Sequence, residues 1–160
     1  MFELKKLNQD ALASAQEKAL RYRLLNQPRL AESICKDILA VDPDHREALV
    51  TLVTRLLTRQ GYAVSGFTGA DEALAALQAS PQDFDLVITD LNMPGLSGLD
   101  LAREVLRLHP HLPVAVTSGY VTDELHDEAA RLGVREVIYK PNTVDEMTAA
   151  IHRVLESLRA

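Results

Sequence analysis

The second part of the chain alternates between two patterns of apolar and polar residues. Short apolar runs, of the kind that form buried strands, occur at 62–67, 86–89, 113–116 and 137–139. Each run is followed by a segment with apolar residues three or four positions apart, which is the helical period, at 71–78, 101–108, 123–132 and 147–158. Strands that alternate with helices predict a parallel sheet covered by helices on both faces.

The first part of the chain shows the helical period alone. Apolar residues predict one helix over 12–22, a second that ends at about Ala40, and a third over 44–60. The apolar stripe of the third helix consists of Leu49, Leu52, Val53, Leu56 and Leu57. We therefore expect a helical hairpin at 1–45 and an α/β domain at 46–160 that shares the helix 44–60.

Composition and charge narrow the possible functions. Hydrophobic residues make up 47% of the 160 positions, which is enough for one packed domain with a small appendage. No apolar stretch approaches the ~20 residues that span a membrane, and the N-terminus lacks a signal peptide's apolar segment. Residues 49–160 carry nine basic and fifteen acidic side chains, which accounts for the whole net charge of −6. With a single cysteine, Cys35, these features predict a cytoplasmic protein that binds neither membranes nor nucleic acids.

Reactive side chains end three of the predicted strands. Asp90 ends the second apolar run, just before a turn rich in Pro and Gly, while Thr117 follows the third run and Lys140 the fourth. The carboxyl ends of parallel strands form the ligand-binding edge of an open α/β sheet. A carboxylate, a hydroxyl and an ammonium group are therefore expected to converge there, a combination that suits holding a phosphoryl group on the carboxylate.

Three motifs carry these residues. They are Thr89-Asp90-Leu91-Asn92-Met93-Pro94-Gly95 with Gly98, Thr117-Ser118-Gly119, and Lys140-Pro141. In type, order and spacing they resemble the receiver domain of two-component response regulators, especially the receivers of hybrid sensor kinases. The resemblance covers about 49–160 and implies a flavodoxin-like α/β fold with a parallel sheet.

Residues at about 10–45 resemble a single tetratricopeptide repeat. The matching positions are Tyr22, Ala31, Cys35, Ile38 and Pro43. An ordinary helical hairpin is the alternative, because Ala19 and Cys35 depart from the residues that the family prefers. One repeat does not bury its own apolar face. This helical arm is therefore expected to pack on a protein partner, on another copy or on the receiver.

The first strand of a receiver lies in the middle of its sheet, and the run 38–41 is the only candidate for it here. As a strand, this run would lie between the strands at 62–67 and 86–89. As a helix, it would be the end of the second helix of the arm. We favour the helix because the apolar stripe of that helix continues through Leu39. The sheet then has four strands, with strand 62–67 beside strand 86–89, and the receiver's first strand is missing or atypical.

The resemblance gives three residues a role in phosphoryl transfer. Asp90 would be the phosphoacceptor, which receives the group from a histidine kinase or a phosphotransfer protein. Lys140 would pair with the phosphoryl oxygens, and Thr117 would donate its hydroxyl to them. The position of the family's aromatic switch residue is Val137 here, which puts that part of the switch in doubt.

The resemblance also implies a Mg²⁺ site. The family holds the ion with two adjacent acids, the phosphoacceptor and a backbone carbonyl two residues beyond it, which here belong to Asp90 and Asn92. The candidates for the acids are Asp42 or Asp44, which are not adjacent. If 38–41 is helical, these two residues lie at the start of the next helix and would cap it. We therefore expect Mg²⁺ binding to be weak.

Together these observations predict a two-component receiver module with Asp90 as its phosphoacceptor. We do not expect an independent enzyme, because the sequence shows no Ser/His/Asp or paired-carboxylate arrangement. The alternative is a protein-binding adaptor with a degenerate receiver fold, which would act without phosphorylation because its acid pair is incomplete.

Overall fold

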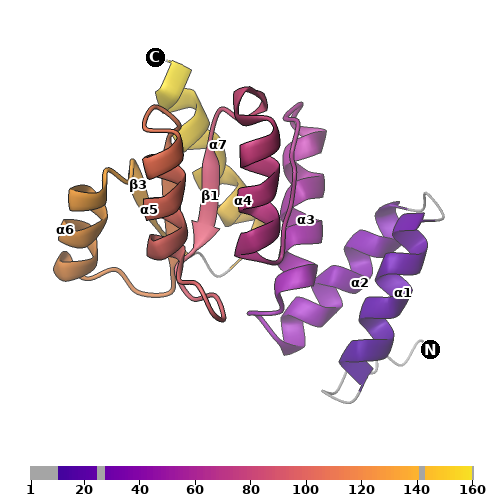
Figure 1. Cartoon of the computed structure of the whole chain (residues 1–160). Helices are drawn as coiled ribbons and strands as arrows, with labels where there is room; N and C mark the ends of the chain where they lie inside the picture. The colour runs from indigo at the N-terminus through magenta and orange to yellow at the C-terminus, as the bar shows by residue number, and fades with distance from the viewer. Residues whose placement is uncertain (1–10, 25–27, 141–142, 160) are drawn as a thin grey trace, which may run out of the picture. The chain divides into compact units, whose positions relative to one another are not determined.

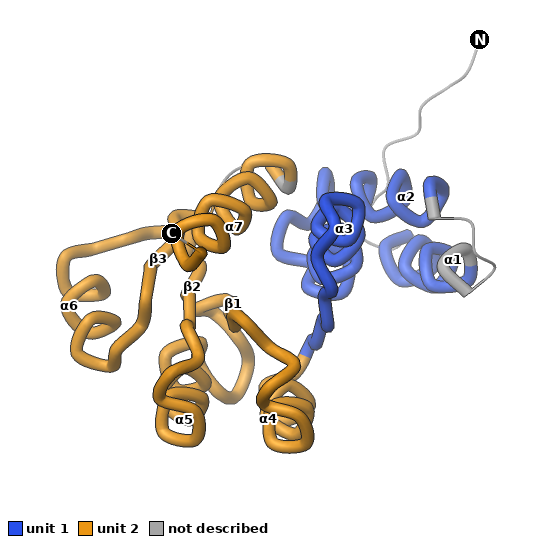
Figure 2. Tube along the Cα trace, turned by 90° about the horizontal axis from the view of Figure 1, so that it is seen from above, with its two compact units in different colours: residues 1–68 blue, residues 69–160 orange. Residues whose placement is uncertain are grey.

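The computed structural model describes residues 11–24, 28–140 and 143–159. The chain divides into two compact units, which are residues 1–68 and 69–160 (Figure 2). The first unit is helical, and the second combines a parallel sheet with helices (Figure 1). Among the described residues, none of the helices combines the length and the apolar character that a membrane crossing needs.

The first unit contains the predicted helices. They are α1 (Leu12–Leu24), α2 (Pro28–Val41) and α3 (Arg46–Arg59). α1 packs against α2, and α2 packs against α3. The buried apolar side chains of this unit are Ala15, Ala19, Ala31, Cys35, Ile38, Ala48, Leu52 and Leu57. Because α2 continues to Val41, the helical interpretation of 38–41 is confirmed.

Residues 62–67 form a loop, so the prediction of a strand there is wrong. The loop leaves the end of α3, where the Tyr62 N–H donates to the Leu57 carbonyl at 3.1 Å. A side chain at Gly66 would lie 2.5 Å from a methyl carbon of Val50, so the loop lies directly against α3. Alternating apolar residues form a strand only where a neighbouring strand pairs with their backbone groups. Within the described residues, no strand pairs with this segment.

The start of α3 also differs from the prediction. His45 is the N-cap, and its Nδ1 accepts a hydrogen bond from the Ala48 N–H at 3.4 Å. Asp42 stays in the preceding turn, where its Oδ1 accepts from the Asp44 N–H at 3.2 Å. The expectation that Asp42 and Asp44 cap this helix is therefore wrong. The tight turn after α2 ends at Asp44, so His45 becomes the N-cap residue of α3.

The sheet of the second unit is parallel throughout. Its strands, in spatial order, are β1 (Val87–Asp90), β2 (Val114–Ser118) and β3 (Glu136–Tyr139). β2 is the central strand, and all five of its residues are buried. These strands confirm three of the predicted runs. The predicted four-strand order is wrong, because β1 is an edge strand of the described sheet and residues 62–67 do not pair with it.

Helices cover both faces of this sheet, as predicted. They are α4 (Ala70–Ala79), α5 (Gly98–Leu108), α6 (Asp123–Leu132) and α7 (Val144–Arg159), and a short 3₁₀ helix, η2 (Pro81–Asp83), follows α4. Leu77, Val105 and Ala129 bring the first three helices into one core with Val114 and Val116 of β2. α7 packs on the opposite face, where Val154 meets Ala115 and Ile138. Figure 2 shows α5 and α7 on opposite sides of the strands.

Candidate functional site at the carboxyl ends of the strands

Asp90 and Lys140 form an ion pair across the sheet. Asp90 is the last residue of β1, and Lys140 follows the last residue of β3. The Lys140 Nζ lies 3.1 Å from Asp90 Oδ2, and the two side chains are 17% and 24% exposed respectively. The other oxygen of the carboxylate, Oδ1, accepts from the Asn92 N–H at 3.3 Å. The carboxylate is thus accessible and fixed in orientation by a cation and a backbone donor.

Thr117 lies between these two residues on the central strand. In the register of the sheet it is the direct neighbour of Asp90. Its buried hydroxyl donates to the Thr89 carbonyl at 3.4 Å, which is at the long end of the hydrogen-bonding range. This hydrogen bond is therefore weak.

Backbone hydrogen bonds continue past the strand ends and hold the three residues in place. The Leu91 N–H donates to the Thr117 carbonyl at 2.8 Å, and the Lys140 N–H donates to the Ser118 carbonyl at 2.7 Å. Each bond ties the residue after an outer strand to the end of β2. The predicted residues Asp90, Thr117 and Lys140 are therefore brought together by the parallel ladders themselves, which is why strand-end positions in the sequence located them.

Gly98 is a site residue whose role was not evident from the sequence. It is the first residue of α5, and its N–H donates to the Leu91 carbonyl at 3.0 Å. A Cβ there would lie 2.8 Å from the Asp90 carbonyl carbon and 2.9 Å from the Leu91 Cα. Only a residue without a side chain lets α5 begin this close to the end of β1. The sequence contained the glycine in the matched motif, but the contact it permits is visible only in three dimensions.

A capping box fixes the start of α5 beside Asp90. The Ser97 hydroxyl accepts from the Asp100 N–H at 3.2 Å, and an Asp100 oxygen accepts from the Ser97 N–H at 3.3 Å. The hydrogen bond from the Ser97 side chain and that from Arg103 lower the pKa of the Asp100 carboxyl. The spacing Ser97-Gly98-Leu99-Asp100 is a sequence signal from which this capping box could be predicted.

Ser118 orders the loop after β2. Its hydroxyl donates to the Tyr120 carbonyl at 2.5 Å and accepts from the Tyr120 N–H at 3.3 Å. The Tyr120 side chain is 72% exposed. The loop that follows Thr117 is thus held by one side chain, and it presents a large aromatic ring to solvent.

Few of the described residues in the second unit are placed to bind a metal ion at this site. Asp90 supplies a carboxylate and Asn92 a backbone carbonyl, and no cluster of three His, Cys, Asp or Glu residues occurs in the part of the chain that the structure describes. Asp42 and Asp44 belong to the first unit, in the turn between α2 and α3. A role for either in metal binding stays a prediction. Pro141, which completes the third motif, lies outside the described residues.

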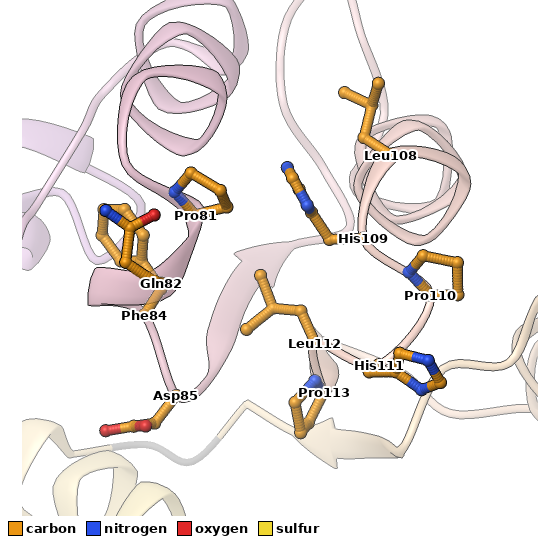
Figure 3. Close-up of a pocket in the computed structure, with 10 residues that line it drawn as sticks. All are labelled: Pro81, Gln82, Phe84, Asp85, Leu108, His109, Pro110, His111, Leu112 and Pro113. Atoms are coloured by element: carbon orange, nitrogen blue, oxygen red, sulfur yellow. The ribbon is translucent and has the colours of Figure 1, made fainter.

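A separate cavity opens at the other end of the same sheet (Figure 3). It has a volume of about 510 Å³ and is lined by the segments that precede β1 and β2. His109 points into it from the end of α5, and no hydrogen-bond partner of its Nε2 occurs among the described residues. The cavity lies at the amino ends of the strands, so it takes no part in the chemistry of Asp90.

A family model described as the response regulator receiver domain matches residues 38–152. Among curated relatives, the chain is 36% identical over 119 residues to the C4-dicarboxylate transport transcriptional regulatory protein DctD of Rhizobium meliloti, covering 74% of this chain and 24% of DctD. It is 36% identical over 99 residues to the chemotaxis protein CheY-3 of Vibrio cholerae, covering 58% of this chain and 76% of CheY-3. The chain spans only about a quarter of DctD and of the transcriptional regulatory protein ZraR of Escherichia coli.

Solved structures give the same result for the fold. A response regulator receiver domain protein from Clostridium thermocellum superposes with a TM-score of 0.61 at 27% identity, covering 71% of this chain and 90% of that one. The receiver domain of NtrX from Brucella abortus gives a TM-score of 0.55 at 34% identity, covering 66% and 88%. The flavodoxin-like receiver fold predicted from the sequence is confirmed, and the adaptor alternative is not favoured. The chain belongs to the family of response regulator receiver domains, the receiver modules of two-component signalling.

Proposed function

We propose that Asp90 is the phosphoacceptor of this receiver and that a histidine kinase or a phosphotransfer protein supplies the phosphoryl group. The observation that carries the proposal is the 3.1 Å contact between Asp90 Oδ2 and Lys140 Nζ. Asp90 ends β1 and Lys140 directly follows β3, fifty positions later in the sequence. The lysine ammonium is a cationic N–H donor, and such a group binds phosphoryl oxygens as well as carboxylates.

The transfer exchanges one phosphorus bond for another. An oxygen of the Asp90 carboxylate attacks the phosphorus of a phosphohistidine, a P–O bond forms, and the P–N bond breaks. The leaving imidazole regains its electron pair, and the product on this chain is an acyl phosphate. Lys140 then shifts its contact from the carboxylate to the phosphoryl oxygens, and Thr117 turns its hydroxyl from the Thr89 carbonyl to the same group. In this role the chain is a phosphoryl acceptor and not an independent enzyme.

Mg²⁺ is the proposed cofactor, held weakly. Asp90 and the Asn92 carbonyl would be its ligands in this unit, which leaves most of the octahedral positions to water and phosphate oxygens. The ion would screen the charge of the incoming phosphoryl group from the Asp90 carboxylate. A third ligand from Asp42 or Asp44 stays a prediction from the sequence.

The helical arm is proposed to bind a protein partner. α1 and α2 form a hairpin whose contacts with the chain are made mainly to each other and to α3. Leu20 and Leu30 of the hairpin are 46% and 48% exposed, which leaves apolar surface for a further contact. The likeness to a tetratricopeptide repeat, the hybrid-kinase type and a cytoplasmic location remain predictions from the sequence.

Phosphorylation of the purified chain tests the proposal. Incubation with Mg²⁺ and a small phosphodonor such as acetyl phosphate should label the wild type and leave Asp90→Ala unlabelled. Asp85→Ala is the matched control, because Asp85 is an exposed carboxylate just before the same strand. It should be labelled like the wild type. Equal labelling of the wild type and Asp90→Ala would contradict the proposal.

A further inference from the structure

One edge of β1 has no neighbour in the described sheet. β1 pairs with β2 through backbone groups that face β2, as in the bonds of the Val87 and Leu91 N–H groups to the carbonyls of Pro113 and Thr117. Backbone groups alternate in direction along a strand, so those of Leu86, Ile88 and Asp90 face the other edge. Within the described residues, the N–H groups of Ile88 and Asp90 form no hydrogen bond.

The composition of β1 is that of an interior strand. None of its four residues is exposed, and the run before Asp90 is apolar with one threonine. β3, the other edge strand, has exposed residues at both ends, Glu136 and Tyr139. Edge strands in natural proteins are usually protected from further pairing by charges, whereas interior parallel strands are apolar throughout. β1 therefore lies at an edge but has the sequence of a strand that is paired on both sides.

We propose that the free edge of β1 pairs with β1 of a second copy of this chain, antiparallel, about a twofold axis through Ile88. In this arrangement Ile88 and its equivalent exchange two hydrogen bonds, N–H to carbonyl in both directions. The Asp90 N–H then donates to the carbonyl of Leu86 of the partner subunit, and the symmetry repeats that bond. The unpaired groups on both edges are satisfied by one another.

The β1 edges of two copies also match in their side chains. A twofold axis perpendicular to the sheet keeps the same face on the same side, so the apolar side chain of Ile88 lies beside its equivalent. Asp90 lies opposite Leu86 of the partner subunit, so the pairing places no like charges opposite each other. Its carboxylate is already paired with Lys140. The β3 edge, with Glu136, has no such match.

Pairing with a second copy also gives an assembly of defined size. Because both subunits use the same edge, an isologous pair leaves no free β1 edge behind and ends at the dimer. The chain's own candidates for a neighbouring strand are in other conformations: residues 38–41 are the end of α2, and residues 62–67 are a loop.

The test measures the mass of the full chain against concentration, by sedimentation equilibrium or light scattering. Ile88→Pro removes the donor on the proposed axis, one of those that face the free edge, and leaves every β1–β2 bond in place. Strands tolerate proline at such an edge position. Ile88→Ala is the matched control, because it loses the same side chain but keeps the N–H. We expect a reversible dimer for the wild type and Ile88→Ala, and a dissociation constant at least tenfold higher for Ile88→Pro than for Ile88→Ala.

A monomeric wild type at all concentrations would overturn the proposal, as would a dimer equally tight in Ile88→Pro and Ile88→Ala. If circular dichroism shows that Ile88→Pro is unfolded, Ile88→Lys replaces it. That variant places two ammonium groups opposite each other on the axis, and it should be monomeric. Hydrogen exchange adds an independent measurement: the amides of Ile88 and Asp90 should become protected as the dimer forms. Protection confined to 136–139 would assign the interface to β3 and refute the pairing.

Discussion

Substitution of Gly98 by alanine tests how closely the start of α5 is packed on the phosphoacceptor strand. The added methyl group would meet only backbone atoms: the Asp90 carbonyl carbon at 2.8 Å, the Leu91 Cα at 2.9 Å and, nearest of all, the Asp90 carbonyl oxygen. The first of these is 0.6 Å shorter than the 3.4 Å at which ordinary contact begins. Backbone atoms do not rotate away as a flexible side chain would, so α5 or the end of β1 has to move.

The size of the effect follows from two opposing contributions. Overpacking a close contact of this kind costs about 1–3 kcal/mol. Alanine is a better helix former than glycine, which returns at most about 1 kcal/mol at a helical position. We therefore expect Gly98→Ala to lower the free energy of unfolding by about 1–2 kcal/mol, and to displace the Asp90 carboxylate from Lys140.

Urea unfolding followed by circular dichroism measures the first effect, and the rate of labelling by acetyl phosphate measures the second. Gly119→Ala is the stability control, because no atom lies within 4 Å of a Cβ built there. It should be neutral or stabilising by up to about 1 kcal/mol, since alanine reduces the entropy of the unfolded chain. If Gly98→Ala were as stable as Gly119→Ala and labelled at the wild-type rate, the steric account of the Gly98 contact would be refuted.

Three further predictions concern the site and its surroundings. Lys140→Met should keep the fold by circular dichroism and label at least about tenfold more slowly, because a lost charge-assisted contact of about 1.5–3 kcal/mol exceeds the 1.4 kcal/mol that corresponds to tenfold. Asp100 has a lowered pKa, so its contribution to stability is present above its unfolded pKa of about 3.9 and is lost as the pH falls through the folded value. Urea unfolding of wild type and Asp100→Asn should therefore differ by a constant amount above about pH 5, and by less below about pH 4. Mg²⁺ binding, followed by titration calorimetry, should be weak and abolished in Asp90→Ala; if Asp42→Ala and Asp44→Ala both bind like the wild type, neither acid is a ligand.

The parts of the fold that the sequence predicted are those in which local pattern and tertiary contact agree. The helix over 123–132 was predicted with its observed bounds, and Gly133 directly after it has the left-handed φ of 87° that favours the end of a helix. β1, β2 and β3 were predicted because each is an apolar run between helical segments. Asp90, Thr117 and Lys140 followed from these strands, because a parallel sheet places all its carboxyl ends at one edge.

The errors occur where the outcome depends on a neighbour that the local sequence does not specify. Residues 62–67 alternate like a strand, but an alternating segment becomes a strand only beside a partner, and these residues lie on α3 instead. The cap of α3 was assigned to Asp42 or Asp44 on charge, whereas the geometry of the turn selects His45. The contact of Gly98 with β1 joins two backbones, and sequence periodicity carries no information about such a distance.

The contacts that hold the Asp90 side chain and the backbone groups at the free edge of β1 are different. Substitutions can therefore affect phosphorylation and dimer formation separately. Asp90 is held by bonds on the β2 side, where the Leu91 N–H reaches Thr117, and by Lys140 after β3. None of these contacts uses the groups that face the free edge. Ile88→Pro is therefore expected to give a monomer that is still labelled at Asp90, whereas Gly98→Ala is expected to be labelled slowly and to remain a dimer. Loss of labelling in Ile88→Pro, with its fold intact by circular dichroism, would show that the site depends on the pairing of β1 and would contradict this separation.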